Sequence, residues 1–139
     1  MPAPEAPRIF PTLRYKDAAG MIDWLGQAFG FAVHARYMNG EDVGHAELAF
    51  GHSMILVGSS RPDGYGSIVG EPGENGGKSV YVAVDDVDAV YITAKAADAT
   101  VVQELTDRDY GSREFICRDP EGNVWCFGSY WPKVEASGG

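Results

Sequence analysis

The order of apolar and polar residues predicts a strand, a helix and three further strands in the first half of the chain. Residues 8–15 are rich in β-branched and aromatic side chains, and Asp17 after them is of a type that favours the helix N-cap. Apolar residues then recur with helical spacing between positions 18 and 29, and Gly30 supplies a left-handed stop. Three short strands are expected next, at residues 31–38, 45–50 and 54–57.

The same pattern returns after residue 78. Residues 79–84 have the composition of a strand, Asp85 and Asp86 can cap a helix, and Asp98 stands where Gly30 stood. Three more strands are predicted at residues 100–103, 112–117 and 124–127. Between the two halves, residues 61–78 hold six glycines and two prolines, so we expect a linker without helices or strands.

Matching positions in the two halves keep a nearly constant separation, which indicates a duplicated module. Asp17 and Asp85 are 68 residues apart, and Glu47 and Glu114 are 67 apart. We therefore predict one α+β domain over residues 1–139, built from two tandem β-α-β-β-β modules. Module one covers residues 8–60, the glycine-rich linker 61–78, and module two 79–131.

Alternation along the strands predicts which side chains share a face. A tight hairpin at Gly51 would pair Phe50 with Ser53 and hence Glu47 with Leu56. One face of module one is then wholly apolar and is expected to receive the helix. The other face is mixed in both modules, and is expected to hold Thr12, Arg14, His45, Glu47, Met54, Leu56, Tyr81, Glu114 and Cys126.

Composition narrows the classes of partner. The chain has 11 Lys and Arg against 20 Asp and Glu, a net charge of −9, without a basic run, so nucleic acid is not an expected partner. Apolar runs are too short to cross a membrane, and the N-terminus lacks the features of a secretory signal, so a cytoplasmic location is expected. The two cysteines, Cys117 and Cys126, are expected to be reduced and buried.

Four motifs give the chain a family resemblance: Asp17 followed by Phe-Gly-Phe at 29–31, Ala-Glu-Leu-Ala-Phe-Gly at 46–51, Val-Asp-Asp-Val-Asp at 84–88, and Asp-Pro-Glu-Gly-Asn at 119–123. They resemble the vicinal oxygen chelate superfamily, which includes glyoxalase I, extradiol dioxygenases and bleomycin-resistance proteins. Over residues 8–131 the chain is similar to the small bacterial glyoxalase/bleomycin-resistance proteins. The resemblance implies a curled mixed sheet around a cup-shaped cavity, and a homodimer.

The resemblance also locates the positions where the family's metal enzymes carry His, Gln or Glu. In this chain they fall on Phe10, Leu56, Ser79 and Cys126. The first three are not usual metal ligands, and a lone thiol cannot hold a divalent cation. We therefore expect neither a glyoxalase-type metal nor another cofactor.

The mixed face has the character of a site for a small organic ligand, with apolar walls and a few polar groups. Glu47, two residues from His45, is a candidate general base or an anchor for a cationic ligand. Alternatively, Glu47 pairs with His45 or with Arg14 on an open sheet.

The loop at 107–113 either closes over the site or is an ordinary hairpin connection. His34 is expected to be a surface histidine. The expected ligand-binding set is Thr12, Arg14, His45, Glu47, Met54, Leu56, Tyr81, Tyr110, Glu114, Cys126 and Trp131.

Two functions remain open. One is a binding protein of the bleomycin-resistance type, which holds a hydrophobic or aromatic, optionally cationic, small molecule without a metal and serves antibiotic resistance or metabolite carriage. The other is a lyase or isomerase of the glyoxalase type acting on a small carbonyl compound, with a metal or with Glu47 as base and His45 as its orienting partner. The missing metal ligands favour binding. The ligand, any reaction, metal binding through other residues and domain swapping in the dimer are left open.

Overall fold

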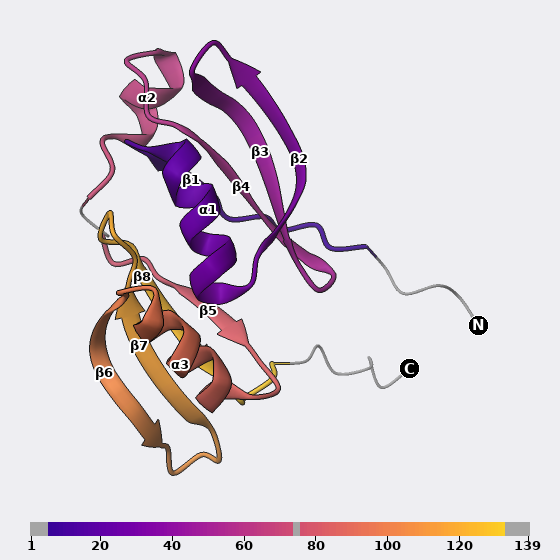
Figure 1. Ribbon diagram of the computed structural model, residues 1–139, viewed down its shortest axis with the longest axis vertical. Helices are drawn as coiled ribbons and strands as arrows, with labels where there is room; N and C mark the ends of the chain where they lie inside the picture. Colours follow the sequence, from indigo (N-terminus) through magenta and orange to yellow (C-terminus); the bar gives the residue numbers. More distant parts are fainter. Residues whose placement is uncertain (1–5, 74–75, 133–139) are drawn as a thin grey trace. The chain divides into compact units, whose positions relative to one another are not determined.

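The computed structural model describes residues 6–73 and 76–132, and the chain divides into two compact units, Met1–Glu74 and Asn75–Gly139. Each unit contains a four-stranded mixed sheet with a helix packed on one face (Figure 1). The predicted α+β class with two β-α-β-β-β modules is confirmed. Within the described residues, no helix is long and apolar enough to cross a membrane.

Unit one follows the predicted order of elements. β1 pairs in parallel with β4, while β3 pairs antiparallel with both β4 and β2. The register places Glu47 opposite Leu56 and Phe50 opposite Ser53, as the hairpin at Gly51 predicts. Its elements are β1 (Thr12–Tyr15), α1 (Ala18–Phe29), β2 (Ala32–Asn39), β3 (Asp42–Phe50), β4 (Ser53–Ser59) and α2 (Gly64–Val69).

The cap residues of α1 fix where the helix begins and ends. The Asp17 carboxylate accepts a hydrogen bond from the Gly20 N–H at 3.1 Å, and Gly30 ends the helix with φ 90°. Because apolar residues recur on one side of α1, the helix covers the apolar face of the sheet, where Leu48 and Val57 are buried. The opposite face of the sheet is free of α1.

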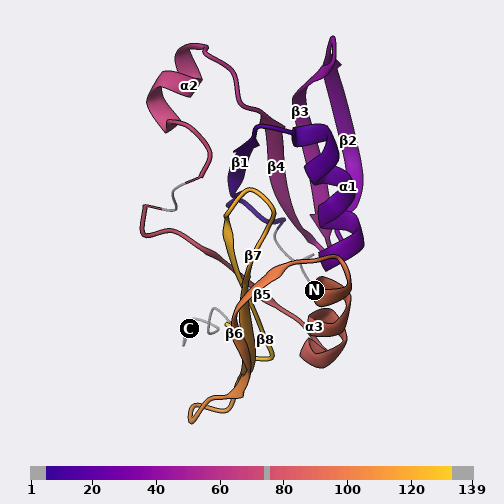
Figure 2. The same ribbon diagram turned by 60° about the vertical axis from the view of Figure 1, so that its left-hand side comes forward.

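The linker contains a helix that the sequence analysis did not predict. Residues 61–78 were expected to lack secondary structure, and this is wrong for α2, which covers Gly64–Val69. The Asp63 carboxylate caps α2 by accepting a hydrogen bond from the Gly66 N–H at 2.7 Å. α2 lies on the side of β1 and β4 opposite to α1 (Figure 2). It therefore approaches the mixed face of unit one.

Unit two repeats the arrangement. β5 pairs in parallel with β8, and β7 pairs antiparallel with β8 and β6. Asp86 caps its helix through the Ala89 N–H at 3.1 Å, and Asp98 takes the predicted left-handed conformation with φ 65°. Its elements are β5 (Val80–Ala83), α3 (Val87–Ala96), β6 (Thr100–Asp107), β7 (Arg113–Arg118) and β8 (Val124–Gly128).

The Asp-Pro-Glu-Gly-Asn motif at 119–123 has a structural role in unit two. The buried Asp119 carboxylate accepts hydrogen bonds from the N–H groups of Glu121 and Asn123, both at 3.0 Å, and from Trp125 Nε1 at 3.1 Å. Trp125 is fully buried and stacks on Phe127 beneath α3. The Asp119 carboxylate thus shapes the turn before β8 and accepts the hydrogen bond of the buried Trp125 indole.

We expect Asp119→Ala to lower the free energy of unfolding by about 2 kcal/mol or more, because it leaves buried N–H donors without an acceptor. Urea unfolding followed by tryptophan fluorescence measures this loss. Asp109→Ala, at an exposed position in the β6–β7 hairpin, is the control and should change stability little. Equal effects of the two substitutions would contradict the structural role of Asp119.

Candidate functional site

The mixed face of unit one is built from three adjacent strands. Thr12 on β1 lies opposite Leu56 on β4, which lies opposite Glu47 on β3, so these residues form a row across the sheet. Arg14, His45 and Met54 share this face by strand alternation. Apart from the exposed Thr12, these side chains are half-buried.

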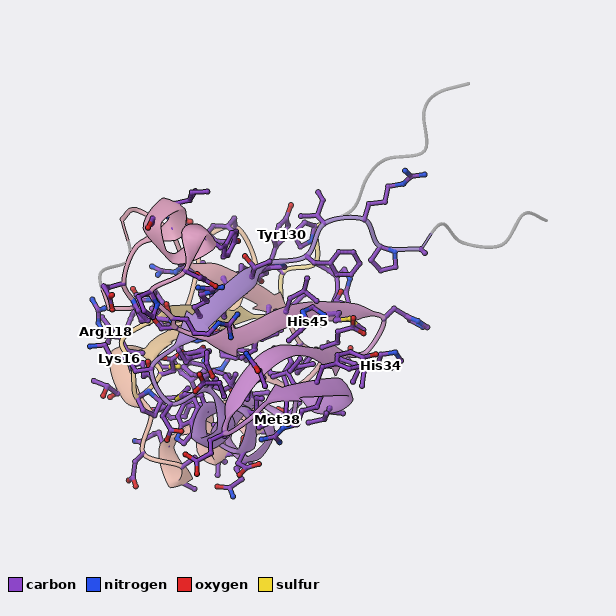
Figure 3. All side chains as sticks on the ribbon, turned by 90° about the horizontal axis from the view of Figure 1, so that it is seen from above. Lys16, His34, Met38, His45, Arg118 and Tyr130 are labelled. Atoms are coloured by element: carbon purple, nitrogen blue, oxygen red, sulfur yellow. The ribbon has the colours of Figure 1, made fainter. Side chains whose placement is uncertain are left out.

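Glu47 is partnered by a histidine on its own strand. His45 Nε2 lies 3.1 Å from Glu47 Oε2, and His34 Nε2 on β2 lies 3.9 Å from Glu47 Oε1. The ring of Tyr37 stacks on His45 with centroids 6.1 Å apart. Figure 3 labels His34 and His45, which come from the neighbouring strands β2 and β3. His45 can therefore orient the Glu47 carboxylate, as one of the predicted alternatives requires.

The alternative in which Arg14 pairs with Glu47 is wrong, because Arg14 pairs with Asp63. Its guanidinium donates to the two Asp63 oxygens at 2.8 and 3.0 Å. The hydrogen bond from Arg14 holds the pKa of Asp63 well below its usual range, and the Gly66 N–H lowers it further. The positive charge of Arg14 is thus matched inside unit one.

α2 also brings an aromatic ring to Arg14. The guanidinium carbon lies 4.8 Å from the centre of the Tyr65 ring, and Tyr65 Oη lies 3.4 Å from Thr12 Oγ1. A Cβ on Gly66 would lie 2.2 Å from the Arg61 carbonyl oxygen, so this approach requires glycine. Asp63 and Tyr65 are therefore parts of the mixed face that the sequence analysis missed.

The mixed face of unit two centres on Glu114, which is 6% exposed on β7. Tyr110 Oη donates to Glu114 Oε2 at 2.8 Å, and Arg108 Nε lies 3.4 Å from Oε1. The predicted approach of Tyr110 to the mixed face is thus present. Arg108, on the same hairpin, was not anticipated.

Tyr81 joins this face from β5. Its hydroxyl donates to the Tyr130 carbonyl at 2.7 Å, and Tyr130 packs edge-on against Tyr110 with ring centroids 6.2 Å apart. A Cβ on Gly128 would lie 2.5 Å from Tyr81 Oη and 2.8 Å from Glu114 Cγ. Glycine at this position therefore lets both side chains occupy the same small region.

Apart from Arg108, the ionisable side chains that approach Glu114 from these strands favour their neutral forms. The hydrogen bond to the Glu114 carboxylate raises the pKa of Tyr110, and burial raises the pKa of Tyr81. Burial, with a smaller contribution from the charge of Glu114, raises the pKa of Cys126 to about 11. Two phenols and one thiol therefore surround Glu114 as uncharged groups at neutral pH.

The positions of the family's metal ligands do not suit a metal in this chain. Phe10 and Leu56 have no donor atom, and the hydroxyl of Ser79 and the single thiol of Cys126 do not make up the set of imidazole and carboxylate ligands that a divalent cation prefers. Across residues 6–73 and 76–132, no group of three or more His, Cys, Asp or Glu side chains is placed to hold a metal ion. We therefore derive no chemistry through a metal.

The predicted site residues thus fall into two groups, one in each unit. Thr12, Arg14, His45, Glu47, Met54 and Leu56 belong to unit one, and Tyr81, Tyr110, Glu114, Cys126 and Trp131 to unit two. Trp131 follows β8 and is half exposed. An aspartate two residues before Tyr65 was a usable capping signal for α2.

Comparison with known families gives one match over most of the chain. The model of the Glyoxalase/Bleomycin resistance protein/Dioxygenase superfamily matches residues 9–127. An uncharacterized protein of Mycobacterium bovis is 33% identical over 126 residues, which cover 88% of this chain and 82% of that protein. An uncharacterized protein of Mycobacterium tuberculosis is also 33% identical, over 88% of this chain and 74% of that protein.

Solved structures show the same fold. The crystal structure of TioX from Micromonospora sp. ML1 is 32% identical, with a TM-score of 0.70 over 87% of this chain and 98% of that one. A glyoxalase/bleomycin resistance protein/dioxygenase family enzyme from Burkholderia phytofirmans PsJN is 22% identical, with a TM-score of 0.69 over 86% and 94%. This second likeness supports the fold alone.

We expect Asp63→Asn to destabilise the chain at neutral pH by removing the ion pair with Arg14, while asparagine keeps the cap of α2. Because folding lowers the Asp63 pKa, the stabilisation is fully present above the unfolded pKa of about 3.9 and is lost as pH falls toward the folded value. The difference between the urea midpoints of wild type and variant should therefore be largest at pH 7 and smaller at pH 3. The control Asp23→Asn, exposed on α1, should show no such gap. A gap that is absent, or that widens in acid, would contradict the pairing.

We expect Cys126 to resist alkylation in the native chain. With a pKa of about 11, its thiolate fraction at pH 8 is on the order of 100-fold below that of a free cysteine, so iodoacetamide should react correspondingly slowly. Peptide mapping by mass spectrometry, with the urea-unfolded chain as reference, measures the rate. Native alkylation as fast as in urea would mean that the thiol is ionised and available as a ligand.

Proposed function

Because the chain belongs to the Glyoxalase/Bleomycin resistance protein/Dioxygenase superfamily, we propose that it binds a small hydrophobic or aromatic molecule with a cationic group, and that it does so without a metal. One observation carries this proposal: each mixed face presents a carboxylate, Glu47 or Glu114, whereas Arg14 of unit one is already paired with Asp63.

The charge balance of the two faces favours a cation over an anion. Arg14 is held in a bidentate pair by Asp63, so it is poorly available to an anionic ligand. Glu114 is buried in unit two, and burial makes an additional positive partner valuable to a carboxylate. The net charge of −9 adds a long-range attraction for cations.

The walls of both faces favour an apolar or aromatic body. Met54 and Leu56 are half-buried in unit one, and Tyr81, Tyr110 and Tyr130 offer ring surfaces in unit two. Aromatic rings contribute contact area together with a polar hydroxyl, which suits a flat organic ligand. The absence of donor atoms at Phe10 and Leu56 supports binding that does not depend on a metal.

In this proposal the protein sequesters a toxic compound such as an antibiotic, or carries a metabolite, rather than changing it. We further propose that it acts as a homodimer in the cytoplasm, with neither nucleic acid nor membrane as a partner. The acidic composition supports the exclusion of nucleic acid as a partner. The antibiotic and the metabolite remain alternatives of one binding function.

A second candidate function rests on the contact between His45 Nε2 and Glu47 Oε2 at 3.1 Å. A carboxylate oriented by an imidazole can remove a proton next to a carbonyl group, which is the step of a metal-free lyase or isomerase. Glu47→Gln would abolish such a reaction, since an amide cannot accept the proton. Unchanged turnover of a small carbonyl substrate by this variant would exclude Glu47 as the base.

We expect aromatic compounds with an amine or quaternary ammonium group to raise the unfolding temperature more than isosteric neutral or carboxylate compounds. Binding to the native state alone stabilises it in proportion to the logarithm of ligand concentration over Kd. Differential scanning fluorimetry of the full chain against matched triplets of cationic, neutral and anionic compounds tests this. A larger shift with the anionic members would contradict the proposal, as would no shift with any compound.

A further inference from the structure

Three tyrosines and one glutamate form a continuous cluster in unit two, here called the tyrosine–glutamate cluster: Tyr81, Tyr110, Tyr130 and Glu114. Tyr110 contacts both Glu114 and the Tyr130 ring, and Tyr81 is bonded to the Tyr130 backbone. The tyrosines are between 36% and 59% exposed, whereas Glu114 is 6% exposed. The cluster therefore places accessible aromatic rings around a buried carboxylate.

The backbone is shaped to bring these groups together. Gly128 lies opposite Glu114 in the β7–β8 register, and a Cβ there would collide with Tyr81 Oη and Glu114 Cγ. The N–H of Tyr130 donates to Ser112 Oγ at 3.1 Å, which holds the segment after β8 beside β7. The rings thus come from β5, from the β6–β7 hairpin and from the end of β8.

The carboxylate of Glu114 has acceptor capacity beyond its partners. Tyr110 gives Oε2 one short hydrogen bond, while Arg108 Nε stands at 3.4 Å from Oε1. Charge-assisted bonds between nitrogen and a carboxylate are usually about 2.7–2.9 Å long, and a carboxylate accepts about four hydrogen bonds. Arg108 is a third exposed, so it is a loosely held cation that a ligand can replace.

We infer that the tyrosine–glutamate cluster binds a compact organic cation, an alkylammonium or quaternary ammonium group, with Glu114 as its counter-ion and the tyrosine rings as its walls. Such cations are attracted to the faces of aromatic rings and to a buried carboxylate. Arg108 takes the cation's place when no ligand is bound. This inference rests on the proposed binding function and assigns the charged end of the ligand to unit two.

The protonation of the cluster matches a single positive charge. A tyrosine phenol is neutral at physiological pH, and the raised pKa values of Tyr81 and Tyr110 keep both hydroxyls available as donors. Glu114 is the acidic group of the cluster, and Arg108 faces it at 3.4 Å. A monocation that displaces Arg108 takes over this pairing, whereas an anion would add like charge beside a buried carboxylate.

A similar trio elsewhere in unit two supplies a matched control. Tyr91 Oη donates to the exposed Glu104, and Lys95 Nζ lies 4.9 Å from the centre of the Tyr91 ring. A phenol, a carboxylate and a basic side chain meet here too, but the lysine already covers the ring face and the carboxylate is open to solvent. Glu104→Gln therefore removes an equal charge from a tyrosine-bonded carboxylate outside the cluster.

The test is an NMR titration of the ¹⁵N-labelled full chain with benzyltrimethylammonium as the cationic probe and benzyl alcohol as the neutral aromatic probe. We expect the cation to shift the amide signals of residues 108–116 and 126–131. Glu114→Gln should weaken its binding by about tenfold, and Glu104→Gln should leave it unchanged. Tyr110→Phe, which keeps the ring, should bind the cation better than Tyr110→Ala.

Arg108→Gln should strengthen binding of the cationic probe, which is the opposite of the effect expected for Glu114→Gln. Removal of the internal cation frees Glu114, so the probe should bind about threefold more tightly or better. This variant keeps the inference testable even if Glu114→Gln fails to fold. Equal weakening by Glu104→Gln, or no gain with Arg108→Gln, would overturn the inference.

The two probes separate the inference from the proposed function. Binding of benzyl alcohol without a preference for the cation, or cation shifts outside the cluster, would overturn the cation site while leaving small-molecule binding intact. Failure of the whole aromatic panel in the thermal experiment together with no shift by either probe would overturn both.

Discussion

The structure depends on one constraint: each four-stranded sheet buries one face under a single helix. Leu48 and Val57 in unit one and Phe115 and Phe127 in unit two fill these helix-covered faces. Because side chains alternate along a strand, the same pairing that buries these residues turns Glu47 and Glu114 to the opposite face. A shift of one residue in register would exchange the two sets, so the fold and the candidate chemistry are fixed by the same hydrogen bonds.

The two carboxylates occupy matching positions but have acquired different surroundings. Glu47 lies beside His45 and within reach of His34, on a face that α2 approaches at Arg14. Glu114 is more deeply buried, with Tyr110 and Arg108 from its own hairpin. The partners of Glu47 come from strands β2 and β3, whereas those of Glu114 come from the β6–β7 hairpin. The mixed faces thereby combine apolar walls with carboxylates, which supports binding of a hydrophobic cation.

Much of the fold followed from local rules. The caps at Asp17 and Gly30 and the left-handed Asp98 were predictable because capping depends on residues close in sequence. α2 was missed because its six residues include two glycines and its cap, Asp63, gains its partner Arg14 from 49 residues away. The candidate site residues were located by alternation, but their partners depend on contacts between distant segments, as for Tyr130 with Ser112 and Tyr81.

The most direct measurement is native mass spectrometry of the full chain as purified from cells, combined with elemental analysis for transition metals. We expect no stoichiometric metal, and a retained organic adduct whose mass identifies a cationic, largely apolar compound. A near-stoichiometric transition metal would contradict metal-free binding, because it would require ligands other than the residues at Phe10, Leu56, Ser79 and Cys126.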